Sequence, residues 1–487
     1  MNVVRRLVGT LLILGLAGLV VYVDHQGGGT REGASSALVS LAGFPQTSET
    51  DRISTSWFCP GVAAGDGIAA ASVVLANPGD VPITASLSLL SDAAPVVETL
   101  VVAARSTRSV DVLRGRTVGV VVPVVEIIGA VGTVEQQLFY AAGDTTSQCV
   151  SQTSQSWYFA DGFTADGSTE RIVLINPYPE AAVVNVAFTT AAGRRTPSAL
   201  QGVILAPRSA RSVSMADAGA TNESRVTVEV QASSGQIVAS RMQHYIGGGR
   251  LGYSTTVGVP QPLDQWWFTS GRTGARVTEQ LVVFNPSDTD AQVSVSFFGP
   301  GITNGIDPAQ SPTAALPSQA VDVPAGTTTW INTDNLADLP KGDHAMLVSV
   351  LNGARLVVDH VLTQSTGSGT FTAIVNGIPT GLLTEKWRIP SGLARGARNA
   401  LGILNTTATD GTFTVSAIGP GGAVALPNLT DVPIGASSLA LLDVPDGVSD
   451  AEIVISATVP VAVQRRTQRG HGLSGFGIVG ALPVRLR

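Results

Sequence analysis

Four copies of one pattern run along this chain, and this repetition constrains the fold more than any other feature. Each copy opens with a tryptophan in an aromatic turn, and these tryptophans are Trp57, Trp157, Trp267 and Trp387. About 20 residues later each copy has an apolar run that ends in asparagine, at Asn77, Asn176, Asn285 and Asn405. Two landmarks that recur together at a period of about 110 residues predict four related units, each long enough to form a core.

The residues that follow each asparagine alternate between apolar and polar side chains. In the third copy Val293, Val295 and Phe297 alternate with polar residues. A period of two is typical of an antiparallel strand with one buried and one solvated face. About eight short strands per copy, separated by turns, favour a β-sandwich of the immunoglobulin-like kind. A single propeller is the alternative, but it would need a shorter period of about 40–50 residues.

The sequence therefore predicts an all-β fold with four tandem β-sandwich repeats after one N-terminal transmembrane helix. We expect the copies to form an extended rod, each closing its own core. The expected boundaries are residues 51–153, 154–262, 263–383 and 384–487.

Composition supports strands and excludes two broad classes of protein. Hydrophobic residues make up 44% of the chain, enough to form cores, so wholesale disorder is excluded. Charged residues make up only 13%, whereas Gly (54 residues) and Pro (27 residues) are abundant, which favours strands joined by turns. The net charge of −7 argues against nucleic acid as a partner, because nucleic-acid binding needs a basic surface.

The N-terminus has the pattern of a membrane anchor. Residues 1–6, which include Arg5 and Arg6, precede the uncharged apolar run Leu7–Val23, and arginines at this place hold the N-terminus in the cytoplasm. We expect a single-pass anchor with the rest of the chain outside the cytoplasm, and a cleaved signal peptide with secretion is the alternative. Residues 24–50 are rich in Gly and Ser and are expected to be a flexible linker.

Cys59 and Cys149 are the two cysteines of the chain. Outside the cytoplasm a disulfide between them is expected, because such compartments are oxidising. The alternative is a pair of buried free thiols.

The sequence offers no catalytic motif, and we expect no enzyme activity, no cofactor and no metal. The five histidines lack metal-ligand spacing. The carboxylates of Asp66, Asp161, Asp166 and Glu170 could hold calcium, but solvated turn carboxylates are the commoner case. The repeated tryptophans are expected in the core, whereas Trp266 and Trp330 lack counterparts and are the candidates to face a ligand.

The opening Trp157-Tyr158-Phe159-Ala160-Asp161-Gly162, the Asn-Pro turns and the closing strand around Arg241 resemble a β-repeat of bacterial surface proteins. With the Trp57-Phe58-Cys59-Pro60-Gly61 opening behind a single anchor, the chain resembles an uncharacterised family of actinobacterial membrane-anchored extracytoplasmic proteins. The resemblance covers nearly everything from residue 51 onward. It implies the architecture and an extracytoplasmic location, and it carries over no catalytic residue.

Three functions remain as hypotheses. The first is a non-enzymatic structural or interaction protein of the cell envelope, with wall polysaccharide or a partner protein as its ligand. The second is an accessory subunit of a complex that assembles envelope polysaccharide, and the third is a hydrolase with an unrecognised carboxylate site.

Overall fold

The computed structural model describes residues 41–48, 54–129, 131–302, 319–335, 339–366, 369–391, 397–445, 448, 451–469 and 475–485. The expected anchor Leu7–Val23 and most of the expected linker lie outside these residues. Residues 43–487 form one compact unit, and Met1–Ala42 are assigned to another. No helix of the described part of the chain is long and apolar enough to span a membrane.

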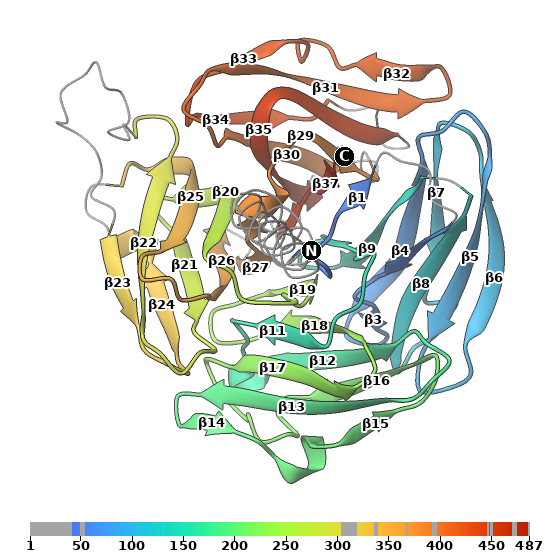
Figure 1. The fold of residues 1–487 in the computed structure, drawn as a ribbon, viewed down its shortest axis with the longest axis vertical. Coiled ribbons are helices and arrows are strands. Elements are labelled where there is room, and N and C mark those ends of the chain that lie inside the picture. Colours follow the sequence, from blue (N-terminus) through green and yellow to red (C-terminus); the bar gives the residue numbers. More distant parts are fainter. Residues whose placement is uncertain are drawn as a thin grey trace, which may run out of the picture. The chain divides into compact units, whose positions relative to one another are not determined.

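The all-β prediction is confirmed (Figure 1). The first copy forms two sheets, which we call outer and inner, as do the second and third copies. The inner sheet is the one whose last strand contacts the last inner strands of other copies. The outer sheet of the first copy contains β2 (Ser54–Phe58), β3 (Val62–Ala63), β5 (Ile83–Leu90), β6 (Val96–Val102) and β8 (Val120–Ile128). Its inner sheet contains β4 (Ile68–Asn77), β7 (Ser106–Asp111), β9 (Thr133–Tyr140) and β10 (Thr145–Gln148).

The second and third copies repeat this arrangement, with four-stranded inner sheets in the orders β16-β12-β18-β19 and β24-β21-β26-β27. The outer strands of the second copy are β11 (Ser156–Phe159), β13 (Ala182–Thr190), β14 (Gly193–Arg195), β15 (Val203–Leu205) and β17 (Thr227–Ser234). The inner ones are β12 (Thr169–Asn176), β16 (Ser209–Ser214), β18 (Val238–Tyr245) and β19 (Gly252–Val257). The outer strands of the third copy are β20 (Gln265–Thr273), β22 (Ala291–Phe298), β23 (Gln319–Val323), β25 (Gly342–Val350) and β28 (Ile378–Pro379). The inner ones are β21 (Val277–Phe284), β24 (Thr328–Asn332), β26 (Val357–Thr366) and β27 (Gly369–Asn376).

In the fourth copy the two sheets are joined by one long strand, β35 (Glu452–Arg469). Its first half pairs with outer strands β29 and β31, and its second half pairs with inner strands β30 and β36. The other strands are β29 (Thr384–Ile389), β30 (Ala397–Asn405), β31 (Gly411–Gly419), β32 (Gly422–Ala425), β33 (Val432–Ile434), β34 (Leu439–Asp443), β36 (Gly477–Gly480) and β37 (Leu482–Arg485). The helices of the described residues are single 3₁₀ turns at Ala165–Gly167, Ser198–Leu200, Thr333–Asn335 and Thr380–Leu382.

Burial along the strands follows from which faces are covered. Outer strand β22 alternates between buried and more exposed positions, as the period of two predicts. The central inner strands β12 and β18 are buried almost continuously, because both faces of the inner sheet are covered by protein.

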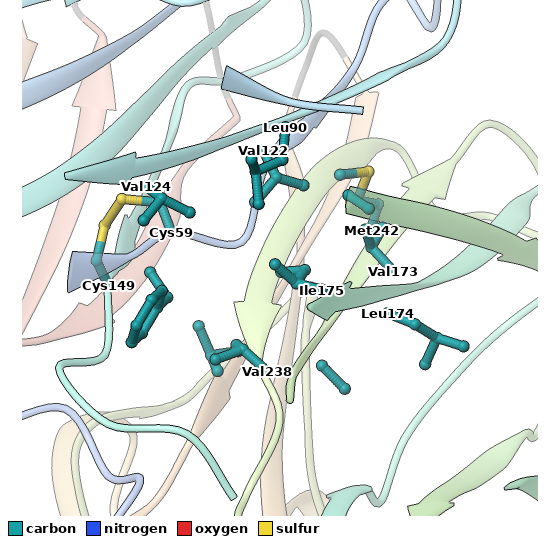
Figure 2. Packing of buried hydrophobic residues seen from close by; sticks show 14 of the residues in the cluster. Cys59, Leu90, Val122, Val124, Cys149, Val173, Leu174, Ile175, Val238 and Met242 are labelled. Atoms are coloured by element: carbon teal, nitrogen blue, oxygen red, sulfur yellow. A yellow bond between two sulfur atoms is a disulfide. The ribbon is translucent and has the colours of Figure 1, made fainter. Parts of the chain in front are cut away.

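The last inner strands of the four copies contact one another in a closed cycle. β10 contacts β19, β19 contacts β27, β27 contacts β36, and β36 contacts β10; β19 and β27 are labelled in Figure 1. The extended rod is therefore wrong, because the first copy contacts the fourth. The cores of the first and second copies are also continuous, since one apolar cluster includes residues of both copies. Figure 2 shows Leu90 and Val122 of the first copy lying near Val173 and Met242 of the second.

Residues 43–48, near the end of the expected linker 24–50, belong to the same unit as the four copies, so the linker prediction is wrong for these residues. Strand β1 (Thr47–Ser48) pairs in parallel with β37 of the fourth copy. Phe44 is buried and its ring centroid lies 6.0 Å from that of Trp266 in the third copy. The linker prediction was based on the Gly- and Ser-rich composition of residues 24–50 as a whole. It therefore missed the short apolar and strand-forming stretch at the end of this segment.

Candidate functional site

The repeated asparagines stabilise the turn that follows each apolar run through hydrogen bonds to its backbone. In each copy the Asn Oδ1 accepts a hydrogen bond from the backbone N–H two residues later, and Nδ2 donates to the carbonyl four residues later. Asparagine suits this position because its short side chain carries both a donor and an acceptor. The four residues Asn77, Asn176, Asn285 and Asn405 are at most 1% exposed. Their role in the structure is thus to shape the turn.

The repeated tryptophans are buried, but in the third copy the equivalent residue is Trp266 rather than Trp267. Trp157 Nε1 donates to the Ile237 carbonyl at 3.0 Å, and Trp387 Nε1 donates to the Val461 carbonyl at 3.1 Å. Trp266 Nε1 makes the matching bond to the Leu356 carbonyl at 3.0 Å. Trp57, Trp157, Trp266 and Trp387 are each 0% exposed.

The two ligand-facing candidates do not form a shared surface. Trp266 is a core residue, so the expectation that it is exposed is wrong. Trp267 is 7% exposed and its Nε1 donates to Thr380 Oγ1. Trp330 is half-buried, and the Arg225 guanidinium carbon lies 4.1 Å from its ring centroid. The guanidinium therefore covers a face of Trp330 on which a ligand could otherwise stack.

The expected disulfide is confirmed. Cys59 lies directly after β2 in the opening turn of the first copy, Cys149 follows β10, and both are 0% exposed. Figure 2 shows the bridge beside Val124 of β8.

Buried polar residues recur at two adjacent positions of one strand in each copy. These strands are β9, β18, β26 and the second half of β35. Strand register defines the first junction position as Glu135, Ser240, Asp359 and Gln464, opposite the residue three before the repeated asparagine. The next residue is the second junction position, which contains Gln136, Arg241, His360 and Arg465. All eight residues are at most 4% exposed. Polar groups this deeply buried are costly unless they are bonded, which directs attention to their partners.

Each residue at the first junction position binds the opening turn of the preceding copy. Ser240 Oγ donates to the Pro60 carbonyl at 2.6 Å, which joins the second copy to the first. Asp359 Oδ2 accepts from the Asp161 backbone N–H at 3.1 Å, which joins the third copy to the second. Gln464 Oε1 accepts from the Thr269 backbone N–H at 2.8 Å, and the Gln464 N–H donates to Thr269 Oγ1 at 3.0 Å.

The fourth junction closes the cycle between the last copy and the first. Glu135 accepts a hydrogen bond from Ser391 Oγ in the opening turn of the fourth copy. Thr133 Oγ1 donates to Glu452 at 2.8 Å, and Gln148 Nε2 donates to the Ala481 carbonyl at 2.8 Å. The same position of the repeat therefore makes all four junctions.

Two of the four junctions contain a buried ion pair between copies. Arg241 Nη1 lies 3.0 Å from Asp359 Oδ2, and Arg465 Nη2 lies 2.8 Å from Glu135 Oε2. Burial lowers the pKa of the Arg241 guanidinium, but Asp359, Glu170 and Asp161 outweigh this and raise it, so Arg241 stays charged. The other two junctions use the neutral residues Ser240 and Gln464.

Glu279 of β21 links the two sheets of the third copy. Its carboxylate lies 2.8 Å from His344 Nε2 of outer strand β25 and 2.8 Å from His360 Nε2 of inner strand β26. Burial raises the pKa of the Glu279 carboxyl, but both histidines, His344 foremost, outweigh burial and hold that pKa below its usual value. Burial lowers the pKa of His344, whereas Glu279 more than compensates and raises it. Glu279 is thereby neutralised inside its own copy.

The carboxylates considered for calcium have other surroundings. Asp66 pairs with Arg171, and Asp166 is exposed in a turn. Asp161 and Glu170 are buried, and burial raises the pKa of both, against the opposing effect of nearby arginines. Within the described ranges, no group of three or more His, Cys, Asp and Glu residues is arranged to hold a metal ion.

The third–fourth junction contains a cleft of about 250 Å³. It lies between β20 and β25 of the third copy and β30, β34 and β35 of the fourth. Its polar lining includes Arg272, Asp343, Arg398, Asp443 and Arg466. No single sequence motif could predict this cleft, because its residues come from five strands of two copies.

A second cavity, of about 60 Å³, lies where the four copies meet. Its lining includes residues of β10, β19, β27 and β36, and Phe44 and Pro45 also line it. Its small volume leaves the 250 Å³ cleft as the better candidate for a ligand site.

These features define the class of protein: an all-β chain whose four related copies are joined in a cycle by buried polar residues. Residues 128–358 and 249–484 match the model of a Family of unknown function (DUF5719), and the chain belongs to this family. The second match begins about one copy after the first and overlaps it, as the internal repetition predicts. No curated protein matches the chain.

Proposed function

We propose that this chain is a non-enzymatic structural and interaction protein of the cell envelope, in which four tandem β-sandwich copies form one platform outside the cytoplasm. The observation that carries the proposal is the cycle of four buried junctions. The polar residues at the first junction position, Glu135, Ser240, Asp359 and Gln464, all bind a neighbouring copy. Buried hydrogen bonds between neighbouring copies hold the copies in fixed relative positions, which suits a protein that presents a binding surface.

Two further observations support the envelope location. Cys59 and Cys149 form a disulfide, and disulfides are typical of oxidising compartments. Leu7–Val23 is uncharged, apolar and preceded by Arg5 and Arg6, as in a single-pass anchor with its N-terminus in the cytoplasm. The resemblance to membrane-anchored actinobacterial proteins agrees with this orientation. Wall polysaccharide or an envelope protein would be the ligand.

The location is tested with the full chain bearing a C-terminal epitope in a bacterial host. External protease added to spheroplasts should remove the epitope while a cytosolic marker protein stays intact. Cys59 and Cys149 should resist alkylation until a reductant is added. A variant lacking Leu7–Val23 is the control and should keep its epitope protected in the cytoplasm. An epitope protected in the full chain, together with two free thiols, would overturn the proposal.

The interaction is tested by co-sedimentation of the detergent-solubilised full chain with isolated wall polysaccharide and with wall-free membranes. Retention on either fraction above the level of an unrelated anchored β-protein is the expected result. Recovery of the whole chain in the supernatant with both fractions would contradict the interaction role.

A further inference from the structure

The cleft at the third–fourth junction differs from the same place at the other junctions. The residue after the second junction position defines a third junction position, which contains Gln137, Met242, Val361 and Arg466. Met242 and Val361 are apolar residues that are each 1% exposed. Gln137 Nε2 donates to Ser391 Oγ at 2.6 Å. Only the third–fourth junction has an arginine here, and Arg466 lines the cleft.

The three arginines of the cleft are not equally neutralised. Arg398 makes a two-pronged ion pair with Asp443, with Nε–Oδ1 at 3.0 Å and Nη2–Oδ2 at 2.6 Å. Arg272 Nε and Arg466 Nη1 both approach Asp343 Oδ1, at 3.7 Å and 3.8 Å. These two distances are longer than a hydrogen bond. Two guanidinium groups thus share one carboxylate, which leaves one positive charge in excess.

The Arg466 guanidinium contacts an aromatic ring, and two of its nitrogen atoms have no hydrogen-bond partner among the described residues. Its guanidinium carbon lies 4.7 Å from the centroid of the Phe476 ring, and its side chain is 17% exposed. Its Nε and Nη2 atoms are buried, and neither has a hydrogen-bond partner among the described residues. Glu279, the other carboxylate with an electrostatic effect on Arg466, is already bound to His344 and His360. Burial lowers the pKa of Arg466 to about 10, Asp343 opposes this, and Arg272 lowers it further.

We propose that the third–fourth cleft binds a small organic anion through a carboxylate or phosphate group that Arg466 and Arg272 hold together. A guanidinium presents paired N–H donors that match both groups, and the partial burial of Arg466 strengthens the attraction. The walls near the arginines include Leu441 and Leu442, so the body of the ligand would lie against apolar surface. A cleft of about 250 Å³ accepts a single sugar acid or a small phosphate ester rather than a large cofactor. This inference deepens the proposed interaction role and rests on it for the source of the ligand.

The test uses the purified full chain in detergent and calorimetric titration with glucuronate as the carboxylate, glycerol 3-phosphate as the phosphate, and glucose as the neutral control. Binding of either anion, with no binding of glucose and a loss of affinity in high salt, is the expected result. No binding of either anion at millimolar concentration would overturn the proposal. Which of the two anions binds more tightly identifies the acidic group.

Two variants change the affinity in opposite directions. Arg466→Gln should weaken binding at least about tenfold, because one charge-assisted contact is lost. Asp343→Asn removes the carboxylate that competes with the ligand, so it should tighten binding. Arg194→Gln, which alters an exposed ion pair with Glu229 outside the cleft, is the control and should bind as the unmodified chain does. Unchanged affinity in both cleft variants would overturn the proposal.

The outcome is independent of the location test. Anion binding by the purified chain together with a cytoplasmic location would refute the envelope proposal and keep the cleft assignment. A confirmed envelope location without anion binding would refute the cleft assignment alone.

Discussion

Replacing Glu135 with alanine should lower the free energy of unfolding by about 3–5 kcal/mol, because Arg465 would remain buried without its partner. The two side chains lie 2.8 Å apart and are 5% and 1% exposed. They belong to the first and fourth copies, so the loss also weakens the junction that closes the cycle. Chemical denaturation of the full chain in detergent, followed by tryptophan fluorescence, measures the change.

Two control variants separate the buried pair from charge in general. The double variant Glu135→Leu/Arg465→Met should recover most of the lost stability, since apolar residues of similar size can replace a buried ion pair. Arg194→Ala, which breaks a more exposed pair with Glu229, should cost no more than about 1 kcal/mol. A cost for Glu135→Ala as small as that of Arg194→Ala would show that the first and fourth copies do not meet as described.

Removing the disulfide through Cys59→Ala/Cys149→Ala should destabilise the first copy by about 4–5 kcal/mol. The two cysteines are 90 residues apart in sequence, and a cross-link over so long a loop removes much of the conformational freedom of the unfolded chain. The loop includes almost the whole first copy, from its opening turn to the end of β10.

Denaturation of the unmodified chain with and without reductant measures the same effect independently. Reductant should shift the unfolding midpoint of the unmodified chain toward that of the double variant, and it should leave the double variant unchanged. If the unfolding midpoint of the unmodified chain were the same with and without reductant, the stabilising role of the disulfide would be contradicted.

The sequence was sufficient to predict an all-β chain with a repeated turn, but not how the copies meet. Period-two alternation and the repeated asparagines depend on local chemistry, so the strands and their turns could be predicted. The neighbouring Trp266 and Trp267 could not be told apart in the same way. Only strand register shows that Trp266 faces the carbonyl of Leu356, as Trp157 faces that of Ile237.

The sequence contains a signal for the junctions. Arg241 and Arg465 lie at the same position of their strands, and Glu135 and Asp359 lie one position earlier in theirs. Opposite charges at adjacent repeat positions of different copies correspond to the ion pairs at two of the four junctions. The cleft, in contrast, depends on Arg466 being brought to Arg272 across two copies, and no local pattern encodes that approach.

An engineered cross-link between the first and fourth copies tests the closed cycle most directly. A Cβ at Gly477 of β36 would lie 3.1 Å from the Cα of Thr145 in β10, which is within reach of a disulfide. The variant Thr145→Cys/Gly477→Cys should form an intramolecular bond that peptide mass spectrometry identifies, alongside the native Cys59–Cys149 bridge, whereas either single variant should keep one free thiol. Two free thiols in the double variant under oxidising conditions, or bonds only between different molecules, would contradict the cycle of junctions.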